Sequence, residues 1–220
     1  MISAPSFKRG FSLVETLVVL AIMSVLTVVT VASVSVIRSE ALTSSGNQMV
    51  DVFAMARQDA MAKNAYVLVL IKTQGAGAYS SYCLLELTRQ DDGSFGSWTA
   101  ITPWRSLGSG VVFESGQAND TFISNTSSLS LPQPLPTSFR YHDQTLDLTA
   151  AGVVAYECYQ PDGTLTGGQN SALCLRLITG TVDPSTGVFT YQGSTVSGKP
   201  VSYYDLVVVS NTGMTKIERP

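Results

Sequence analysis

The longest apolar stretch of the chain lies near its N-terminus and predicts one membrane-spanning helix. Residues 16–37 include no charged side chain over 22 positions, and a helix needs about 20 apolar residues to cross a bilayer. Lys8 and Arg9 precede this stretch. Because positive charge stays on the cytoplasmic side, we expect a cytoplasmic N-terminus and an exported chain beyond Arg38.

A second helical pattern follows the apolar stretch. Apolar residues recur there at steps of three and four, which is typical of an amphipathic helix, at Leu42, Met49, Phe53, Ala56 and Ala60. The pattern predicts a helical extension over residues 38–64 that packs one face on the following domain. Residues 43–46 are weak helix formers, so we expect a bend or local melting near Gly46.

Beyond Asn64 the chain changes to short β-rich runs separated by turn residues. The expected strands are Tyr66–Lys72, Tyr79–Thr88, Val111–Glu114, Val153–Tyr159, Ala172–Ile178, Val188–Tyr191 and Tyr203–Ser210. This pattern predicts one exported β-rich domain over residues 65–220, built of antiparallel sheets that are stacked or strongly curved. The preceding helix would cover one face.

A Ser-rich stretch at residues 124–138 interrupts the strand pattern. Pro132, Pro134 and Pro136 alternate within it, and proline cannot donate to a central ladder. We therefore expect an exposed, extended loop without a dedicated role, with a partner contact as the alternative.

Glu15 is the only charged residue between Phe11 and Ile37, and it is the leading candidate for a functional residue. A carboxylate inside a membrane is costly unless it has a partner, so it suggests a functional site. If the chain were cut between Gly10 and Phe11, the new α-amino group of Phe11 could neutralise Glu15 of a neighbouring copy. Proximity to a helix N-terminus would give Glu15 at most ~1 kcal/mol, too little to offset burial.

An ordinary secretory signal is the rival interpretation of the same segment. Residues 30–32, Thr-Val-Ala, provide a small-residue cleavage site. However, the apolar run exceeds the ~7–15 residues typical of such signals, and Glu15 lies where they are purely apolar. These two features favour a retained helix.

Composition argues against several functional classes. The formal net charge is −3, and loss of Lys8 and Arg9 would make it −5, so a basic surface for nucleic acid is missing. His142 is the only histidine, and neither Gly-x-Ser-x-Gly nor a phosphate-binding loop is present. We therefore expect no enzyme, no cofactor and no small-molecule substrate. Asp91, Asp92, Asp143 and Asp147 do not reproduce an EF-hand loop, and we expect no metal site.

The three cysteines, Cys83, Cys158 and Cys174, lack the spacing of a zinc or redox site. Cys158 and Cys174 lie symmetrically about a loop, as expected for opposed residues in a hairpin, and could form a disulfide in an exported domain. The alternative is that all three are buried thiols acting as small apolar groups.

Together, Lys8, Arg9, Gly10, Phe11 and Glu15 resemble the class III signal of type IV prepilins and type II secretion pseudopilins. Residues 53–67 resemble the end of the helix in the H-type pseudopilin and FimT/FimU minor pilin group, with matches at Ala56, Arg57, Ala60 and Asn64. Residues 159–163, 207–213 and 219–220 are similar to the closing strands of that group. Residues 104–107 and 110–113 also resemble a prepilin-like lineage called Verru_Chthon cassette protein D.

The resemblance implies an α+β pilin-like fold, in which a long N-terminal helix packs on a C-terminal antiparallel β domain. It divides the chain into a leader peptide (1–10), a transmembrane and assembly helix (11–37), the helix extension (38–64) and the exported domain (65–220). It implies prepilin peptidase cleavage after Gly10, N-methylation of Phe11 and Glu15 as the assembly carboxylate. Arg57 and Asn64 would have structural roles.

The implied function is that of a minor pilin or pseudopilin of a type IV pilus or type II secretion system. Its partners would be other pilins, prepilin peptidase and inner-membrane lipid. The chain would reside in the inner membrane and then in a filament. The alternative is an exported, membrane-anchored binding module that does not polymerise.

Overall fold

The computed structural model describes residues 12–115, 121–123, 131–142, 144–148, 154–166, 172–183, 186–193, 195–197 and 199–219, without the side chains of 28–36 and 144–147. The chain divides into two units, Met1–Ile37 and Arg38–Pro220, and each is described by itself. The 51-residue helix α1, Leu13–Lys63, contributes to both.

In the second unit, α1 packs one face into the main core, as its apolar spacing predicts. The side chains buried on this face are Leu42, Met49, Val52, Phe53, Ala56 and Ala60. The helix ends where Asn64 adopts a left-handed backbone conformation with φ of 51°, and the N–H of Ala65 donates to the carbonyl of Ala60 at 3.0 Å. The amphipathic extension is therefore found where the sequence predicts it.

Local melting near Gly46, one of the two expected outcomes, is not found, because the helix is continuous through this residue. Gly46 instead lets a strand approach closely: a Cβ atom there would overlap the aromatic ring of Tyr204. The Tyr204 hydroxyl also donates to Oδ1 of Asn47 at 2.7 Å. Glycine at this position serves close packing, which a sequence pattern confined to the helix does not reveal.

The first antiparallel sheet has five strands, in the order β3-β2-β1-β8 with β4 also paired to β2. Its members are β1 (Tyr66–Lys72), β2 (Ser81–Arg89), β3 (Phe95–Ala100), β4 (Arg105–Ser106) and β8 (Val154–Tyr159). Strand β1 is central, pairing Leu70 with Cys83 on one side and Leu68 with Cys158 on the other.

The second sheet also has five strands, in the order β10-β9-β13-β14 with β5 paired to β9. Its members are β5 (Val111–Phe113), β9 (Ala172–Val182), β10 (Phe189–Tyr191), β13 (Tyr203–Val209) and β14 (Met214–Glu218). Two separate hairpins complete the unit: β6 (Ser138–Tyr141) with β7 (Gln144–Asp147), and β11 (Thr195–Val196) with β12 (Lys199–Pro200).

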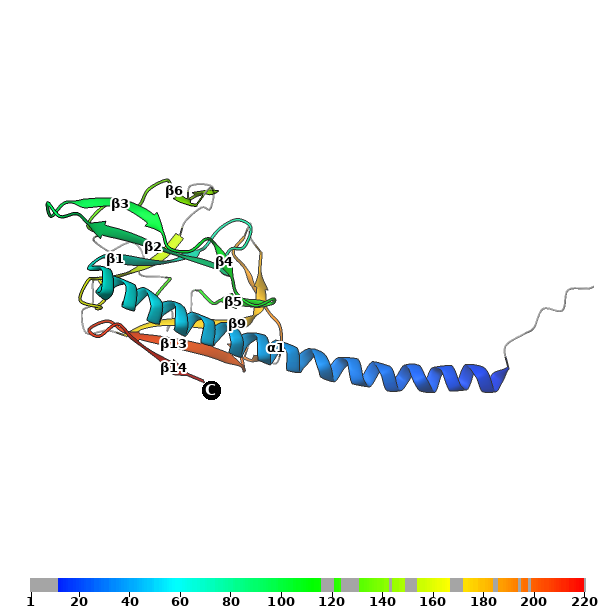
Figure 1. Ribbon diagram of the computed structural model, residues 1–220. Coiled ribbons are helices and arrows are strands. Elements are labelled where there is room, and N and C mark those ends of the chain that lie inside the picture. Colours follow the sequence, from blue (N-terminus) through cyan, green and yellow to red (C-terminus); the bar gives the residue numbers. More distant parts are fainter. Residues whose placement is uncertain are drawn as a thin grey trace, which may run out of the picture. The chain divides into compact units, whose positions relative to one another are not determined.

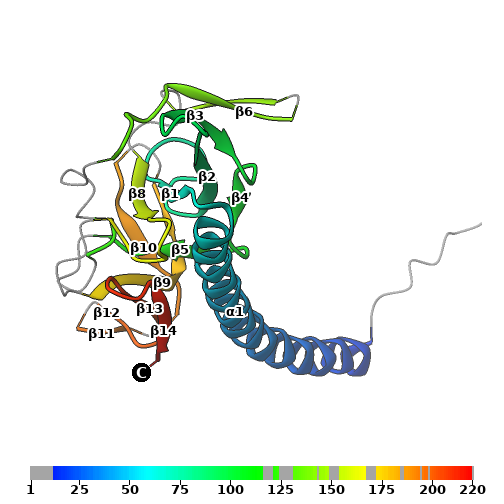
Figure 2. The same ribbon diagram turned by 60° about the vertical axis from the view of Figure 1, so that its left-hand side comes forward.

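The main core lies between residues 38–63 of α1 and both sheets, and Figures 1 and 2 show the helix running along them. Alternation along β1 sends Val67, Val69 and Ile71 into this core. Leu68 and Leu70 point into a smaller apolar cluster on the opposite face of the sheet. Both faces of β1 are thus buried, which explains its continuous apolar sequence.

The described end of the Ser- and Pro-rich loop, residues 131–137, helps to cover that smaller cluster. Leu131 and Leu135 pack against it, and the indole N–H of Trp98 donates to the carbonyl of Pro134 at 3.2 Å. The expectation of a merely exposed loop is therefore wrong for this part. Residues 124–130 lie outside the described residues.

The antiparallel α+β fold class is confirmed. Within the described chain, a long helix packs against two antiparallel sheets.

Candidate assembly site

The first part of α1 forms a regular helix whose hydroxyl side chains bond to its own backbone. The N–H groups of Glu15 and Thr16 donate to the carbonyl of Ser12 at 3.0 and 3.2 Å. The hydroxyl groups of Thr16, Ser24 and Thr27 donate to carbonyls three or four residues earlier. Such back-bonding lets a polar residue sit in an apolar helix without a partner from outside.

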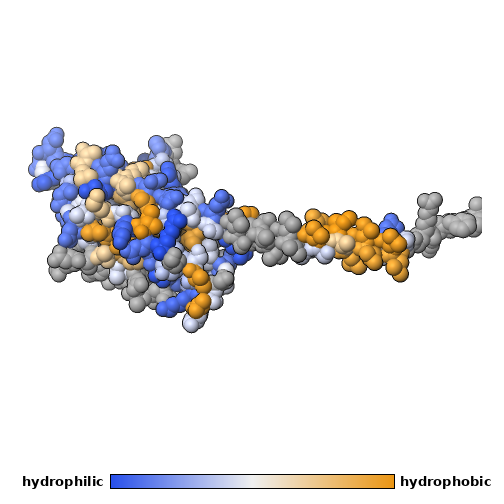
Figure 3. Space-filling model, turned by 90° about the horizontal axis from the view of Figure 1, so that it is seen from below, coloured by the Kyte–Doolittle hydropathy of each residue, from blue (hydrophilic) through white to orange (hydrophobic). Residues whose placement is uncertain are grey.

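Large apolar side chains cover this part of the helix. Between Leu13 and Leu26 these side chains are 46% to 79% exposed, and Figure 3 shows them as an apolar band on the visible face. They do not form a single stripe, unlike those of a helix that packs one face on a domain. A surface of this kind requires a cover of lipid or protein.

Glu15 lies in the first turn of α1 and is exposed. Between Ser12 and Ile37 it is the only ionisable side chain. The predicted cleavage and methylation residues, Gly10 and Phe11, lie outside the described residues. Any contact between Glu15 and an amino group would have to involve another chain or a residue outside this description.

Within the described part of the chain, no helix is both long enough and apolar enough to span a membrane.

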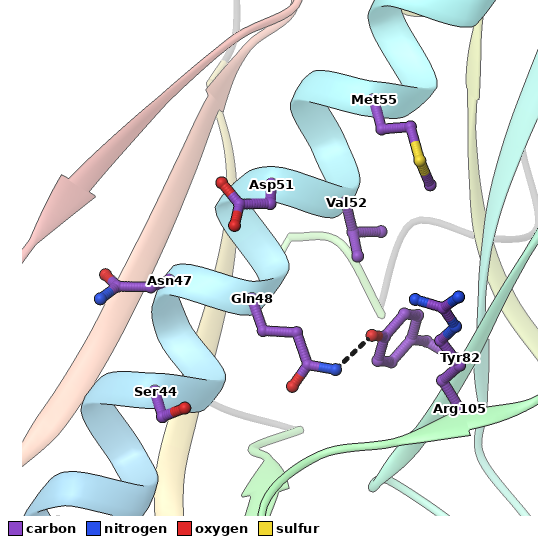
Figure 4. A pocket seen from close by; sticks show the side chains of 8 residues that line it. All are labelled: Ser44, Asn47, Gln48, Asp51, Val52, Met55, Tyr82 and Arg105. Atoms are coloured by element: carbon purple, nitrogen blue, oxygen red, sulfur yellow. Dashed lines mark hydrogen bonds between the residues drawn. The ribbon is translucent and has the colours of Figure 1, made fainter.

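The second unit contains a polar pocket beside α1, with a volume of about 490 Å³. It is lined by Ser44, Asn47, Gln48, Asp51, Val52 and Met55 of the helix and by Tyr82 and Arg105 of the first sheet (Figure 4). Nε2 of Gln48 donates to the Tyr82 hydroxyl at 2.6 Å. Burial raises the pKa of Tyr82, although the Gln48 hydrogen bond and the nearby Arg105 charge act in the opposite direction.

An ion cluster in the second sheet joins Arg176 of β9 to Asp205 of β13 and to Glu114, the residue that follows β5. Arg176 binds the Asp205 carboxylate through two hydrogen bonds of 2.7 and 2.8 Å. It also lies 3.8 Å from Glu114, which accepts a hydrogen bond from the Tyr191 hydroxyl. The Asp205 hydrogen bond raises the pKa of Arg176. Charges opposed on adjacent strands favour one register, so this cluster has a structural explanation.

Glu157 on β8 is the most unusual ionisable residue among those described. It is 1% exposed, and its Oε1 atom has no hydrogen-bond partner. It lies opposite Val69 of the main core. Burial raises the pKa of Glu157 to about 8, because an apolar environment disfavours the charged form.

Arg57 and Asn64, for which we expect structural roles, each take part in holding the fold. Arg57 donates from Nε to the carbonyl of Thr212 at 2.7 Å, which ties α1 to the turn between β13 and β14. Asn64 ends the helix. His142 is exposed and stacks edge-on with Tyr141. Among the described residues, no three His, Cys, Asp or Glu side chains group as metal ligands.

The predicted opposition of Cys158 and Cys174 is wrong. Cys158 pairs with Leu68 in the first sheet, whereas Cys174 pairs with Val207 in the second. No disulfide joins them. Cys83 and Cys158 lie in the smaller apolar cluster, and burial raises the pKa of the Cys158 thiol to about 12. These two cysteines act as small apolar groups, the alternative that the sequence also allowed.

Comparison with known proteins gives a short N-terminal match. Residues 6–31 match the family model described as the prokaryotic N-terminal methylation motif, which confirms the prepilin-like resemblance of this segment. No curated protein matches the chain.

Two solved structures of the minor pseudopilin EpsH from the type II secretion system of Vibrio cholerae are similar to the chain. The first is 9% identical, and the match covers 81% of this chain and 95% of the EpsH chain. The second is 12% identical, and the match covers 83% of this chain and 97% of the EpsH chain. Both have a TM-score of 0.37. At this TM-score, the likeness carries no conclusion about the function of this chain.

Proposed function

We propose that the chain is a minor pilin or pseudopilin, a structural subunit that assembles through its N-terminal helix into a filament of a type IV pilus or type II secretion system. A methylation motif at residues 6–31 implies anchoring in the inner membrane through this segment. Prepilin peptidase would cut between Gly10 and Phe11 and leave residues 11–37 as the membrane and assembly helix. The H-type group is the subgroup we favour.

The observation that supports assembly most directly is the surface of residues 13–26. Its apolar side chains are exposed around the helix, and its one charge, Glu15, lies in the first turn. A lipid anchor needs only the apolar side chains. A carboxylate at this position becomes useful when a cation from a neighbouring subunit reaches it, and the α-amino group of a processed Phe11 would be such a cation.

Processing can be tested at Gly10. Mass spectrometry of the mature chain should give an N-terminus at Phe11, about 14 Da heavier when methylated. Cleavage must occur on the cytoplasmic side to leave the apolar helix attached, which places it at Gly10. Gly10→Leu puts a bulky side chain at this position and should leave the full-length precursor in the membrane. A mature N-terminus near Ser33, or normal-length product from Gly10→Leu, would mean conventional signal-peptide processing.

Assembly can be tested at Glu15, with Glu40 as the matched control. Both are exposed glutamates of α1, but Glu40 lies beyond the apolar part. Glu15→Ala should leave membrane insertion intact and strongly reduce incorporation into sheared filaments, because breaking a buried charge pair costs ~3–5 kcal/mol. Glu40→Ala should incorporate normally. Equal incorporation of both variants would contradict an assembly role for Glu15.

The alternative is an exported binding module that is anchored by the same helix and never polymerises. Co-purification separates the two functions, because a subunit should appear with other prepilins in sheared filaments. Repeated absence from such filaments, with normal processing at Gly10, would favour the binding module.

A further inference from the structure

Arg105 is held in place by the backbone around it. Strand β4 pairs with β2 so that Arg105 lies opposite Tyr82, which directs both side chains to the same face of the sheet. The next residues are fixed as well: the N–H of Leu107 donates to the carbonyl of Ser80 at 2.8 Å, and the N–H of Gly108 donates to the Ser45 hydroxyl at 2.9 Å. The guanidinium is therefore presented to the polar pocket by an ordered segment.

The charges lining the pocket do not neutralise each other. Within the described residues, neither Arg105 nor Asp51 forms an ion pair. Figure 4 shows the Asp51 carboxylate pointing away from the Arg105 guanidinium, on the other side of the helix turn. The side of the pocket with Tyr82 therefore carries an uncompensated positive charge.

Two kinds of hydrogen-bond donor meet on that side. The Tyr82 hydroxyl accepts from Gln48, so its own hydrogen can be donated to another acceptor. Arg105 supplies guanidinium N–H groups beside it, close enough to influence the pKa of Tyr82. An ionised carboxylate only accepts hydrogen bonds, and it pairs with arginine in a bidentate geometry. It is the common protein group that matches this donor set.

We infer that the polar pocket receives an aspartate or glutamate side chain of a neighbouring subunit, with Arg105 as its main ligand and the Tyr82 hydroxyl as the second donor. This inference rests on the proposed function and adds a contact in the exported domain to the one at Glu15.

The position of the pocket along α1 favours a neighbouring subunit as the source of the carboxylate. The pocket begins at Ser44, seven residues beyond Ile37, on the helix whose apolar part is proposed to pack between subunits. Seven residues correspond to about two turns of this continuous helix. Acidic residues also outnumber basic ones, 16 to 13, so a cationic site suits contacts between subunits of this composition.

The test uses photo-crosslinking of the full-length chain in its native membrane. A benzophenone amino acid replaces Met55, which lines the pocket, and a second reporter replaces Leu20 in the apolar part of α1. We expect the reporter at 55 to crosslink to another subunit. Mass spectrometry of the crosslinked peptide should identify a segment that includes an Asp or Glu.

Arg105→Gln should reduce the crosslink at 55 at least tenfold, the effect of losing one hydrogen bond between charged groups. Arg105→Lys should retain part of it, because the charge remains but the bidentate geometry is lost. Tyr82→Phe, which keeps the ring and removes the hydroxyl, should reduce the crosslink several-fold. Arg89→Gln is the control, because Arg89 is an exposed arginine bonded to the carbonyl of Gly93 in its own turn.

The two reporters distinguish failure of this inference from failure of the proposed function. If the reporter at 20 still crosslinks to a subunit while Arg105→Gln behaves like Arg89→Gln at 55, the pocket inference is overturned alone. A crosslink at 55 to lipid, or to a peptide without an acidic residue, overturns it as well. If neither reporter captures another subunit, the proposed assembly itself fails and the inference fails with it.

Discussion

The two parts of helix α1 differ in whether their apolar side chains are exposed or buried. From Leu13 to Leu26 these side chains are exposed, whereas from Leu42 to Ala60 they are buried on one face against two sheets. Both parts are regular helix. Secondary structure is therefore shared, and the difference lies in the pattern of the residues: continuous apolar sequence in the first part and a stripe at helical spacing in the second.

This difference shows that one continuous helix can expose apolar side chains in one part and bury them in a protein core in the other. The second part gains its stability from the domain that it helps to build, since most helical stability in proteins comes from tertiary packing. The large apolar side chains of the first part are exposed, so this surface is available to lipid or to protein. Exchange of one part's pattern for the other's would remove the function of each.

The sharpest test of this contrast compares Phe53→Ala with Leu20→Ala. Phe53 is fully buried and meets the rings of Phe122 and Tyr159 edge-on, at centroid distances of 5.8 and 6.5 Å. Its truncation should cost ~3–5 kcal/mol of the free energy of unfolding. Leu20→Ala should leave that free energy unchanged, because Leu20 is 68% exposed.

Denaturant unfolding of the detergent-solubilised chain measures this difference. Both tryptophans, Trp98 and Trp104, lie in the second unit, so their fluorescence reports on that unit. If Leu20→Ala lost as much stability as Phe53→Ala, the view that only the second part of the helix stabilises the folded domain would be contradicted.

Much of the fold follows from the sequence where local pattern and burial agree. The run Tyr66–Lys72 is predicted to the residue, because both faces of β1 are buried and its sequence is continuously apolar. Strands β3 and β14 were missed. Their sequences, FGSWTA and MTKIE, are polar or mixed, and they become strands by pairing with β2 and β13. Edge strands depend on a partner that a local pattern does not reveal.

The candidate functional residues also differ in whether a local sequence pattern reveals them. Glu15 is a candidate from the sequence alone, because a carboxylate at the start of a long apolar run is a local signal, and its assembly role stays a prediction. The polar pocket was missed because Gln48, Tyr82 and Arg105 are far apart in the chain and individually ordinary. The expected Cys158 and Cys174 pairing failed for the related reason that symmetric numbering about a loop does not fix strand pairing; each strand pairs with a different neighbour.

The second part of α1 also packs on a core that contains the buried Glu157, which predicts an unusual pH dependence. The pKa of Glu157 is raised to about 8 in the folded chain, against ~4.3 for an exposed glutamate. Between these values the unfolded chain releases the proton while the folded chain keeps it. Stability should therefore fall as pH rises from about 4 to about 8, by up to about 5 kcal/mol at 1.36 kcal/mol for each pKa unit.

Glu157→Gln should remove this dependence, because the neutral amide has no proton to lose. At pH 9 the variant should be more stable than the natural chain, and near pH 4 the two should be similar. Glu218→Gln, at an exposed residue of β14, is the control and should keep the natural slope. Parallel stability curves for Glu157→Gln and the natural chain would show that Glu157 titrates normally.

The smallest expected effect concerns Gly46, where the buried part of α1 approaches the second sheet. A Cβ at this position would overlap the Tyr204 ring, so Gly46→Ala should destabilise the second unit by ~1–3 kcal/mol through overpacking. This loss opposes the gain of up to ~1 kcal/mol that alanine usually brings to a helix interior. The sign of the change therefore separates close packing from the bend that the sequence predicted. Tyr204→Leu makes room at the same contact, so the double variant should lose less than the sum of the two single losses. A stabilising Gly46→Ala, measured by the same tryptophan fluorescence, would mean that the helix and the sheet do not meet at this residue.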